Sequence, residues 1–175
     1  MNDFDQELDL LTPIDLPGLS DSTIGDELSA NRNGERFVAF FLGGSLYGIR
    51  ASDIAEVSHP VHITPLPSSP GMLLGIAPLR GEIVAVINLK QMVGETSENP
   101  SPKNKLVVLK ESGRTGDSQI AFPVDKMHEI VVLGRDEVSP ASSDSNGILA
   151  GRAMTSTAEM QIVDTARLAA SLAAA

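Results

Sequence analysis

The sequence predicts an all-β protein made of two small closed barrels that pack side by side. Three observations favour this fold class. Short apolar runs recur at short spacing with Gly and Pro at the turns between them, as in barrels and sandwiches. The second half of the chain repeats the apolar pattern of the first, which indicates two copies of one small unit. Aromatic residues make up only 3% of the 175 residues and Trp is absent, so the core must be aliphatic.

The composition excludes several classes of protein. Without Cys the chain has neither a disulfide framework nor a thiolate zinc site. No run approaches the roughly 18 apolar residues of a transmembrane helix, and the N-terminus lacks the basic-then-apolar pattern of a signal peptide. We therefore expect a cytoplasmic protein without direct membrane insertion. The net charge of -10 argues against nucleic acid and anionic membranes as main partners.

Residues 1–33 differ from the rest of the chain. They hold eight acidic residues and one base, so they carry -7 of the net charge, and Pro13, Pro17 and Gly18 interrupt any long helix. This composition predicts a largely disordered extension before a folded domain at residues 34–175. The apolar residues within LDLLTPIDL leave a second interpretation open, in which this segment docks on a partner or folds back on its own domain.

Deletion of residues 1–33 tests these two interpretations. If the extension is disordered, the deletion leaves Tm within a few degrees, because a chain segment that packs against nothing adds little stability. A fall of about ten degrees or more would show that the LDLLTPIDL segment packs on the domain. Thermal unfolding followed by circular dichroism compares the full chain with residues 34–175.

The first half of the domain is predicted to be a succession of short strands. Apolar runs of strand length are separated by Gly-Gly, by a polar triplet and by TPLPSSP, whose three prolines require an extended loop. The expected elements are, in order, a strand at residues 37–42, a hairpin turn at Gly43-Gly44, a strand at 46–49, a tight turn at 51–53, a strand through Ile54 and Val57, and a loop at 64–70.

Residues 71–94 form the centre of this pattern. The apolar run at residues 83–87 lacks the alternation of a half-exposed strand, which predicts a strand buried on both faces. Asn88 can cap a short helix at residues 89–93, and Gly94 suits the left-handed position that ends it.

Arg80 lies in the turn just before that strand, between two apolar segments and bracketed by Pro78 and Gly81. Three interpretations remain open: a solvated turn residue, a side chain that a partner binds, or a side chain that ties the two barrels together. Arg is over-represented at the energetic centres of interfaces, because its planar fork pairs bidentately and its stem packs.

The repeat can be aligned without gaps. Residues 120–130 (IAFPVDKMHEI) align with 47–57 (YGIRASDIAEV), so that the apolar positions coincide and Glu129 falls on Glu56. A second block, QIVDTARL, aligns in the same way with AVINLKQM and places Asp164 at the capping position of the first helix.

These alignments set the expected boundaries of the two units. The first barrel is predicted at about 35–95, with closing elements from the second half, and the second at about 104–168. The remaining elements expected in the second half are a strand at 105–110, loops at 112–118 and 139–147, and an Ala-rich helix from Ala166 to the end.

The sequence offers no catalytic constellation. His59 and His62 are three apart in a predicted strand or loop, which puts them on opposite faces, and His128 is expected to be solvated or satisfied. GGSLYG lacks the Lys-Ser/Thr of a phosphate-binding loop, and no Ser lies in a nucleophile elbow. We therefore expect a binding protein rather than an enzyme, with no cofactor and no metal. The alternative is a small enzyme or a metal-binding β-barrel protein.

Several motifs, in the same order and at the same distances, resemble the CheW-like coupling proteins of bacterial chemosensory systems. The resemblance covers about residues 36–168. The family's patterns and their counterparts are an opening strand at 37–49 (FVAFFLGGSLYGI), V-x-E-V at 54–57 (IAEV), T-P-L-P at 64–67, G-V-x-N-L-R-G at 75–81 (GIAPLRG), P-V-I-D-L at 85–89 (AVINL), and G-L-x-V-D-x-V-x-E-V at 121–130 (AFPVDKMHEI).

The resemblance implies two SH3-like five-stranded β-barrels with short helical turns. It also implies an adaptor that couples methyl-accepting chemoreceptors to a CheA-type histidine kinase. In that family the first barrel contacts the regulatory domain of the kinase, and the cytoplasmic tip of the receptor docks between the barrels, near the V-x-E-V and L-R-G elements. The implied partner-binding residues are Ile54, Glu56, Gly75 and Arg80, and the implied location is the cytoplasm, at membrane-associated receptor arrays.

Three positions depart from the family pattern. Pro78 stands where the family usually has Asn, Ala85 where it often has Pro, and Asn88 where it usually has Asp. The acidic extension also lies outside the pattern. These differences favour, as an alternative, a paralogue in a pilus-type chemosensory system that controls type IV pilus twitching or phototaxis.

Overall fold

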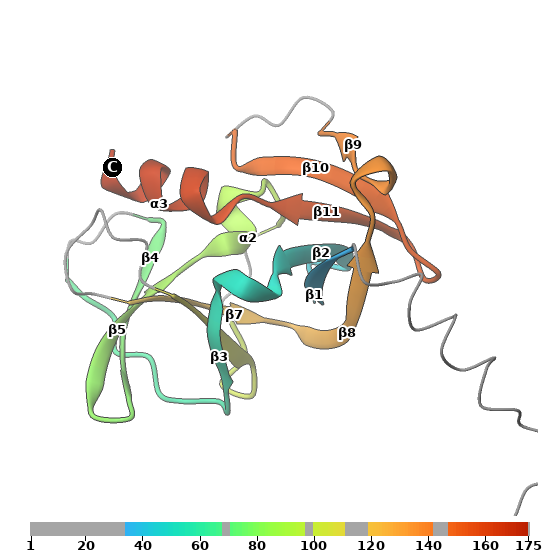
Figure 1. Cartoon of the computed structure of the whole chain (residues 1–175). Helices are drawn as coiled ribbons and strands as arrows, with labels where there is room; N and C mark the ends of the chain where they lie inside the picture. The colour runs from blue at the N-terminus through green and yellow to red at the C-terminus, as the bar shows by residue number, and fades with distance from the viewer. Residues whose placement is uncertain (1–33, 68–70, 97–99, 111–118, 142–146, 175) are drawn as a thin grey trace, which may run out of the picture. The chain divides into compact units, whose positions relative to one another are not determined.

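The computed structural model describes residues 34–67, 71–96, 100–110, 119–141 and 147–174. The predicted extension at residues 1–33 and the predicted loop at 112–118 lie outside the described residues. The described part is dominated by strands (Figure 1). The strands are β1 Glu35–Leu42, β2 Ser45–Arg50, β3 Ile54–Ser58, β4 Leu73–Leu79, β5 Glu82–Ile87, β6 Lys105–Leu109, β7 Ile120–Val124, β8 Lys126–Leu133, β9 Ser139–Pro140, β10 Leu149–Met154 and β11 Glu159–Val163.

The strands form two sheets. Sheet A has the order β8-β1-β2-β11-β10-β9, and sheet B has the order β3-β6-β7-β5-β4. All neighbours are antiparallel except two pairs, β11 with β2 and β5 with β7, which are parallel. The predicted all-β class is therefore confirmed, as are the hairpin of β1 and β2 and the 3-10 turn at Ala51–Asp53.

Each sheet draws strands from both halves of the chain. The third strand of each half pairs with the first strand of the other half. Thus β3 pairs with β6, and β8 pairs with β1. The repeat found in the sequence is thus also a repeat of structure. Sheet B combines β3, β4 and β5 with β6 and β7 of the second half, as the expected closing elements require. The ranges 35–95 and 104–168 do not coincide with the sheets, because β1 and β2 lie in sheet A. A repeat identifies equivalent strands, whereas strand pairing decides which sheet each one joins.

Both sheets are joined at their edges by the chain that follows the third strand of each half. After β3, Thr64 exchanges two backbone hydrogen bonds with Ile76 of β4, which is the opposite edge of sheet B. After β8, β9 pairs with β10, with Pro140 opposite Gly151. These closures agree with the predicted barrels. They also correct the predicted loop at 139–147, because its first two residues form β9.

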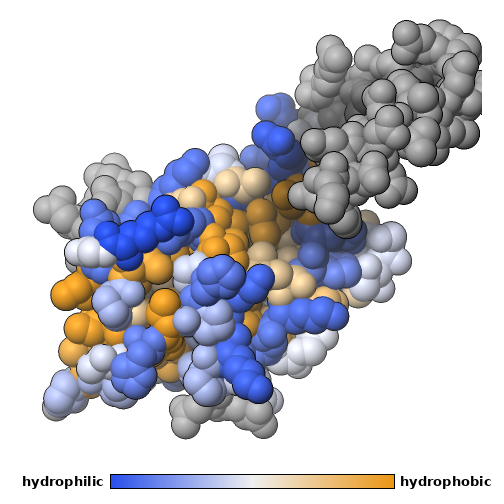
Figure 2. Space-filling model, turned by 90° about the horizontal axis from the view of Figure 1, so that it is seen from below, coloured by the Kyte–Doolittle hydropathy of each residue, from blue (hydrophilic) through white to orange (hydrophobic). Residues whose placement is uncertain are grey.

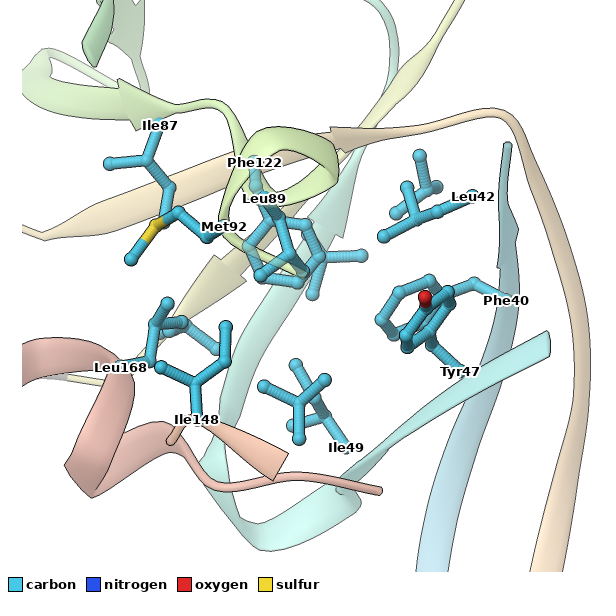
Figure 3. Packing of buried hydrophobic residues seen from close by; sticks show 14 of the residues in the cluster. Phe40, Leu42, Tyr47, Ile49, Ile87, Leu89, Met92, Phe122, Ile148 and Leu168 are labelled. Atoms are coloured by element: carbon cyan, nitrogen blue, oxygen red, sulfur yellow. The ribbon is translucent and has the colours of Figure 1, made fainter. Parts of the chain in front are cut away.

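The largest buried cluster contains residues from both sheets (Figure 3). Phe40 of β1 and Phe122 of β7 meet with ring centroids 5.6 Å apart. Leu168 of α3 and Leu89 of α2 pack into the same cluster. Two further clusters each come from a single sheet. The shared cluster therefore holds the two sheets together.

One short helix follows the last strand of each half, and both helices are capped as predicted. The helices are α2 Leu89–Met92 and α3 Thr165–Ala173. The side chain of Asn88 accepts a hydrogen bond from the N–H of Gln91, and Asp164 accepts from the first N–H groups of α3. Such caps satisfy donors that have no partner inside the helix.

The prediction that the strand at residues 83–87 is buried on both faces is wrong at its first residue. Val84 and Val86 are fully buried, but Ile83 is 64% exposed. Ile83 pairs with Pro78 close to the end of the β4–β5 hairpin, where it lies outside the buried clusters. An unbroken apolar run does not by itself distinguish a core position from an apolar surface position.

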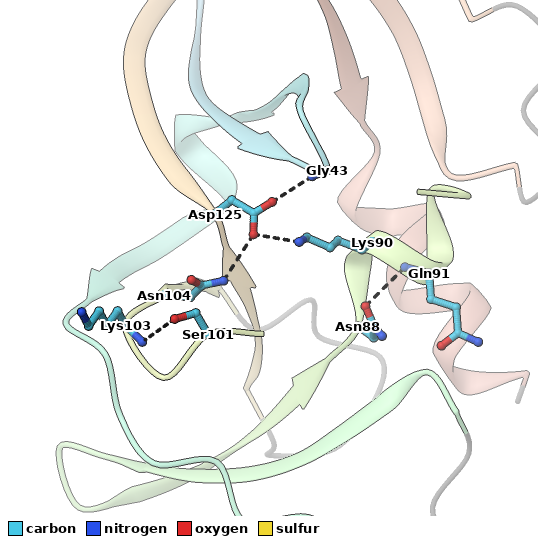
Figure 4. A network of polar contacts seen from close by, with 8 residues as sticks. All are labelled: Gly43, Asn88, Lys90, Gln91, Ser101, Lys103, Asn104 and Asp125. Carbon is cyan, nitrogen blue, oxygen red and sulfur yellow. Dashed lines mark hydrogen bonds and ion pairs between the residues drawn. The ribbon is translucent and has the colours of Figure 1, made fainter. Parts of the chain in front are cut away.

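Asp125 lies where the chain passes from β7 in sheet B to β8 in sheet A (Figure 4). Its Oδ2 accepts a hydrogen bond of 2.8 Å from the N–H of Gly43 in the β1–β2 turn, and its Oδ1 lies 2.8 Å from Nζ of Lys90 on α2. Asn104 Nδ2 donates to the same Oδ1 at 3.4 Å. One carboxylate thus ties a turn of sheet A to the helix that follows sheet B.

Burial by itself would raise the pKa of Asp125. The hydrogen bonds from Lys90 and Gly43, together with the positive charge of Lys90, outweigh burial and hold the pKa below its usual value of 3.8. A carboxyl group with a lowered pKa stabilises the fold above the unfolded-state value. That stabilisation is lost as the pH falls through the lower, folded-state value.

Asp125→Asn removes this charge while keeping the shape of the side chain. We expect the free energy of unfolding near neutral pH to fall by about 1–2 kcal/mol, since the side chain is 35% exposed and solvent screens the pair. The difference from wild type should narrow as the pH falls from about 5 to about 2. Urea unfolding across this range measures it, with Asp136→Asn at an exposed position as the control. A loss of unfolding free energy that does not change with pH would contradict a stabilising charge on Asp125.

Candidate functional site

Two of the four predicted partner-binding residues meet in one ion pair. Nη2 of Arg80 lies 2.7 Å from Oε2 of Glu56. Glu56 is on β3 and Arg80 is in the β4–β5 turn, so the pair connects one edge strand of sheet B with the hairpin at the other edge. Residues far apart in the sequence are brought together because the sheet closes on itself.

The backbone holds Arg80 in an unusual conformation. Arg80 and Gly81 have φ values of 50° and 89°, the positive sign that a type I′ hairpin turn requires at both central positions. Arg80 is the only residue other than Gly with positive φ in the part of the chain that the structure describes. The side chain is 81% exposed, so the open question about Arg80 is answered in part: it is solvent-accessible, and it is also paired.

Glu56 presents a carboxylate whose pairing is incomplete. Its side chain is only 21% exposed, and Arg80 occupies Oε2. Oε1 is buried, and no described residue hydrogen-bonds to it. A buried acceptor without a partner is costly, so a donor that reached this oxygen would bind favourably.

Exposed apolar side chains lie near both members of the ion pair in the sequence. Val57 follows Glu56 and is 39% exposed, and the cross-strand pair of Pro78 and Ile83 flanks the Arg80 turn on the exposed side of the hairpin. Seen from below the view of Figure 1, apolar surface gathers on the side of the β4–β5 hairpin and is crossed by hydrophilic side chains (Figure 2). The surface thus combines a charged pair with apolar area, as protein interfaces do.

The other two predicted residues, Ile54 and Gly75, are less exposed than Arg80. Ile54 begins β3, is partly buried and packs against the cluster shared by the sheets. Gly75 is buried within β4, with a φ of 147°. A Cβ atom at Gly75 would overlap the carbonyl oxygen of Thr64. Gly75 therefore lacks both a side chain and an exposed position from which to contact a partner.

Sequence reasoning missed Val57 and Ile83 as surface residues, because Val57 was assigned to a strand of unstated exposure and Ile83 to a strand buried on both faces. The signal that could have found them is position: each lies beside one member of the Glu56–Arg80 pair. It also missed the role of Thr64, whose backbone closes sheet B. That role depends on a contact between distant segments, which the sequence does not show.

The described residues show no other chemical centre. Among them, no three His, Cys, Asp or Glu side chains lie close enough together to hold a metal ion. His128 is satisfied, as predicted, by Thr157 Oγ1 at 3.0 Å from Nε2. In the part that the structure describes, none of the helices has the length and apolar character needed to cross a bilayer.

A family model, curated relatives and a solved structure match this chain. The family model of the CheW-like domain matches residues 36–173. The chain belongs to the CheW-like family. This is a family of chemotaxis scaffold and adaptor proteins, which agrees with the resemblance found in the motifs.

Individual relatives support this assignment. The chemotaxis protein CheW of Helicobacter pylori is 25% identical over 134 residues, which cover 75% of this chain and 79% of the relative. Protein FrzA of Myxococcus xanthus is 27% identical over 74 residues, or 42% of this chain and 46% of FrzA. The crystal structure of the scaffolding protein TtCheW from Thermoanaerobacter tengcongensis matches with a TM-score of 0.65 at 27% identity, covering 74% of this CheW-like chain and 88% of that one.

Proposed function

We propose that this CheW-like chain is a non-enzymatic adaptor that couples methyl-accepting chemoreceptors to a CheA-type histidine kinase in the cytoplasm, at membrane-associated receptor arrays. The observation that carries the proposal is the meeting of the family's V-x-E-V and L-R-G elements in one surface. Glu56 and Arg80, which stand at the matching positions, form an ion pair of 2.7 Å there.

The chemistry of this surface suits protein contacts. The exposed guanidinium of Arg80 can keep one donor on Glu56 and offer others to a partner, because its five N–H groups point in several directions. Oε1 of Glu56 is buried without a partner among the described residues, so a partner's donor can satisfy it only if the Glu56 side chain turns outward. Ile83, which is exposed in the hairpin that carries Arg80, adds apolar area that a partner would bury.

The four predicted residues have different roles under this proposal. Glu56 and Arg80 contact the partner directly, the receptor tip above all. Ile54 anchors β3 to the shared core, and Gly75 shapes sheet B from within. The regulatory domain of the kinase binds elsewhere on the chain, at the first barrel of the family pattern.

Calorimetric titration tests the proposal. The purified full chain should bind the C-terminal regulatory domain of a CheA-type kinase from its own cell with a Kd of about a micromolar or tighter. It should show no hydrolase, transferase or metal-dependent activity. The proposal fails if the chain binds no such kinase from its own cell.

Arg80→Ala separates partner binding from stability. Arg80 is 81% exposed but Glu56 only 21%, so the pair is half-buried. We expect Tm to fall by a few degrees, because the exposed guanidinium itself adds little whereas the Glu56 carboxylate loses its ion-pair partner. Binding to a cytoplasmic receptor fragment or to the kinase should weaken by about 1–3 kcal/mol, as truncated anchors do. Arg80→Lys keeps the charge but loses the planar fork, so we expect an intermediate loss.

The control for this variant is Arg152→Ala. Arg152 forms an exposed ion pair within the β10–β11 hairpin of the other sheet, with Glu159 Oε2 at 3.6 Å. Thermal unfolding and binding are measured on all three variants. A folded Arg80→Ala protein with wild-type binding would remove Arg80 from the interface.

The pilus-type chemosensory system is the second candidate. It is favoured by the departures at Pro78, Ala85 and Asn88, two of which lie in the β4–β5 hairpin that carries Arg80. Titration against the kinases of both systems from the same cell distinguishes them, because the chain should bind its own kinase more tightly. The identity of the neighbouring genes provides a second, independent criterion.

A further inference from the structure

The two sheets are closed by the same device at equivalent positions. In β4, a break in register falls next to Gly75, and the carbonyl of Thr64 lies where a Cβ of Gly75 would be. In β10, a break in register falls next to Gly151, whose Cβ would meet the carbonyl oxygen of Ser139 at 2.6 Å. Both glycines are buried. Each lets the segment that closes its sheet lie directly on the bulged strand.

We propose that Gly75 is a positioning residue for partner coupling, acting through the Glu56–Arg80 ion pair, and that Gly151 is its structural counterpart without such a pair. This inference rests on the proposed function and deepens it. Under this inference, Gly75 affects partner binding by aligning Glu56 and Arg80, and not by contacting the partner itself.

Chain geometry connects Gly75 to the pair. The closing segment continues from β3, which carries Glu56, and seats on β4, which ends in the Arg80 turn. Thr64 N donates to Ile76 O at 2.8 Å, and Ile76 N donates to Thr64 O at 2.9 Å. These bonds set how closely β3 approaches the hairpin. A side chain at Gly75 would push the closing segment away from β4 and separate the carboxylate from the guanidinium.

The second sheet supplies a matched control. The turn of the β10–β11 hairpin contacts the corresponding edge strand through Thr157 and His128 Nε2, at 3.0 Å. No arginine–glutamate pair joins these two elements among the described residues. Gly151→Ala therefore disturbs an equivalent closure, but it leaves Glu56 and Arg80 untouched.

The test is a double-mutant cycle on binding of the full chain to a purified receptor cytoplasmic fragment and to the kinase regulatory domain. In the wild-type background, Gly75→Ala should weaken binding to the receptor fragment or to the kinase domain, whichever needs the ion pair, at least about fivefold. In the Arg80→Ala background the loss should be less than about twofold, because both changes remove the same pair. Gly151→Ala should add to Arg80→Ala within about twofold, as independent sites do. Additive behaviour of Gly75→Ala overturns the proposal, because a purely structural loss or a direct contact would add.

Amide hydrogen exchange gives a readout that needs no partner. In Gly75→Ala, the amides of Thr64 and Ile76 should exchange faster, and the guanidinium resonances of Arg80 should move toward those of a free side chain. Unchanged exchange or an unchanged Arg80 signal overturns the inference. If wild type binds neither partner, the proposed function fails, and this measurement still decides the positioning role.

Thr64→Pro covers the case in which Gly75→Ala does not fold. It removes the amide that donates to Ile76 without adding an atom at Gly75. The same cycle with Arg80→Ala then applies. Non-additivity supports the positioning role, and additivity contradicts it.

Discussion

The cluster that both sheets share is the constraint on which the rest of the structure depends. Phe40 and Phe122 are large, fully buried and in contact, and each belongs to a different sheet. Because the cluster draws on both sheets and on both helices, neither sheet completes its core alone. Two crossings of the chain, at Ala51–Asp53 and at Asp125, link the sheets covalently. Fixing the sheets to each other fixes the surfaces that they present.

Polar contacts refine this arrangement at the two crossings. Asp125 holds Gly43 and Lys90, and Asp53 Oδ2 accepts a hydrogen bond of 2.7 Å from Thr165 Oγ1 on α3. In each case a carboxylate at a crossing binds a residue of a capped helix. The helices are therefore docked by both apolar packing and a specific polar contact. Contacts that fix a binding surface before a partner arrives reduce the entropy lost on binding.

Local sequence signals predicted the elements well. Gly43-Gly44, Asn88 and Asp164 each produced the expected turn or cap, because such features depend on a few neighbouring residues. The gap-free repeat correctly indicated equivalent strands. The sequence predicted that the first barrel takes closing elements from the second half, but not which strands these are, because alternation and turn residues carry no information about which distant edge a strand joins. Ile83 was misplaced for the same reason: burial depends on what packs over a residue.

The sequence by itself determined the class of the fold and the family. It also determined which residue types form the ion pair, an acid in one motif and an arginine in another. Only the tertiary structure decided that these two side chains touch, because their contact exists once sheet B closes through Thr64 and Ile76. It also separated exposed Arg80 from buried Gly75, which lie in one motif. Neighbours along a chain can have opposite environments, since packing in three dimensions, and not sequence distance, sets the exposure of each residue.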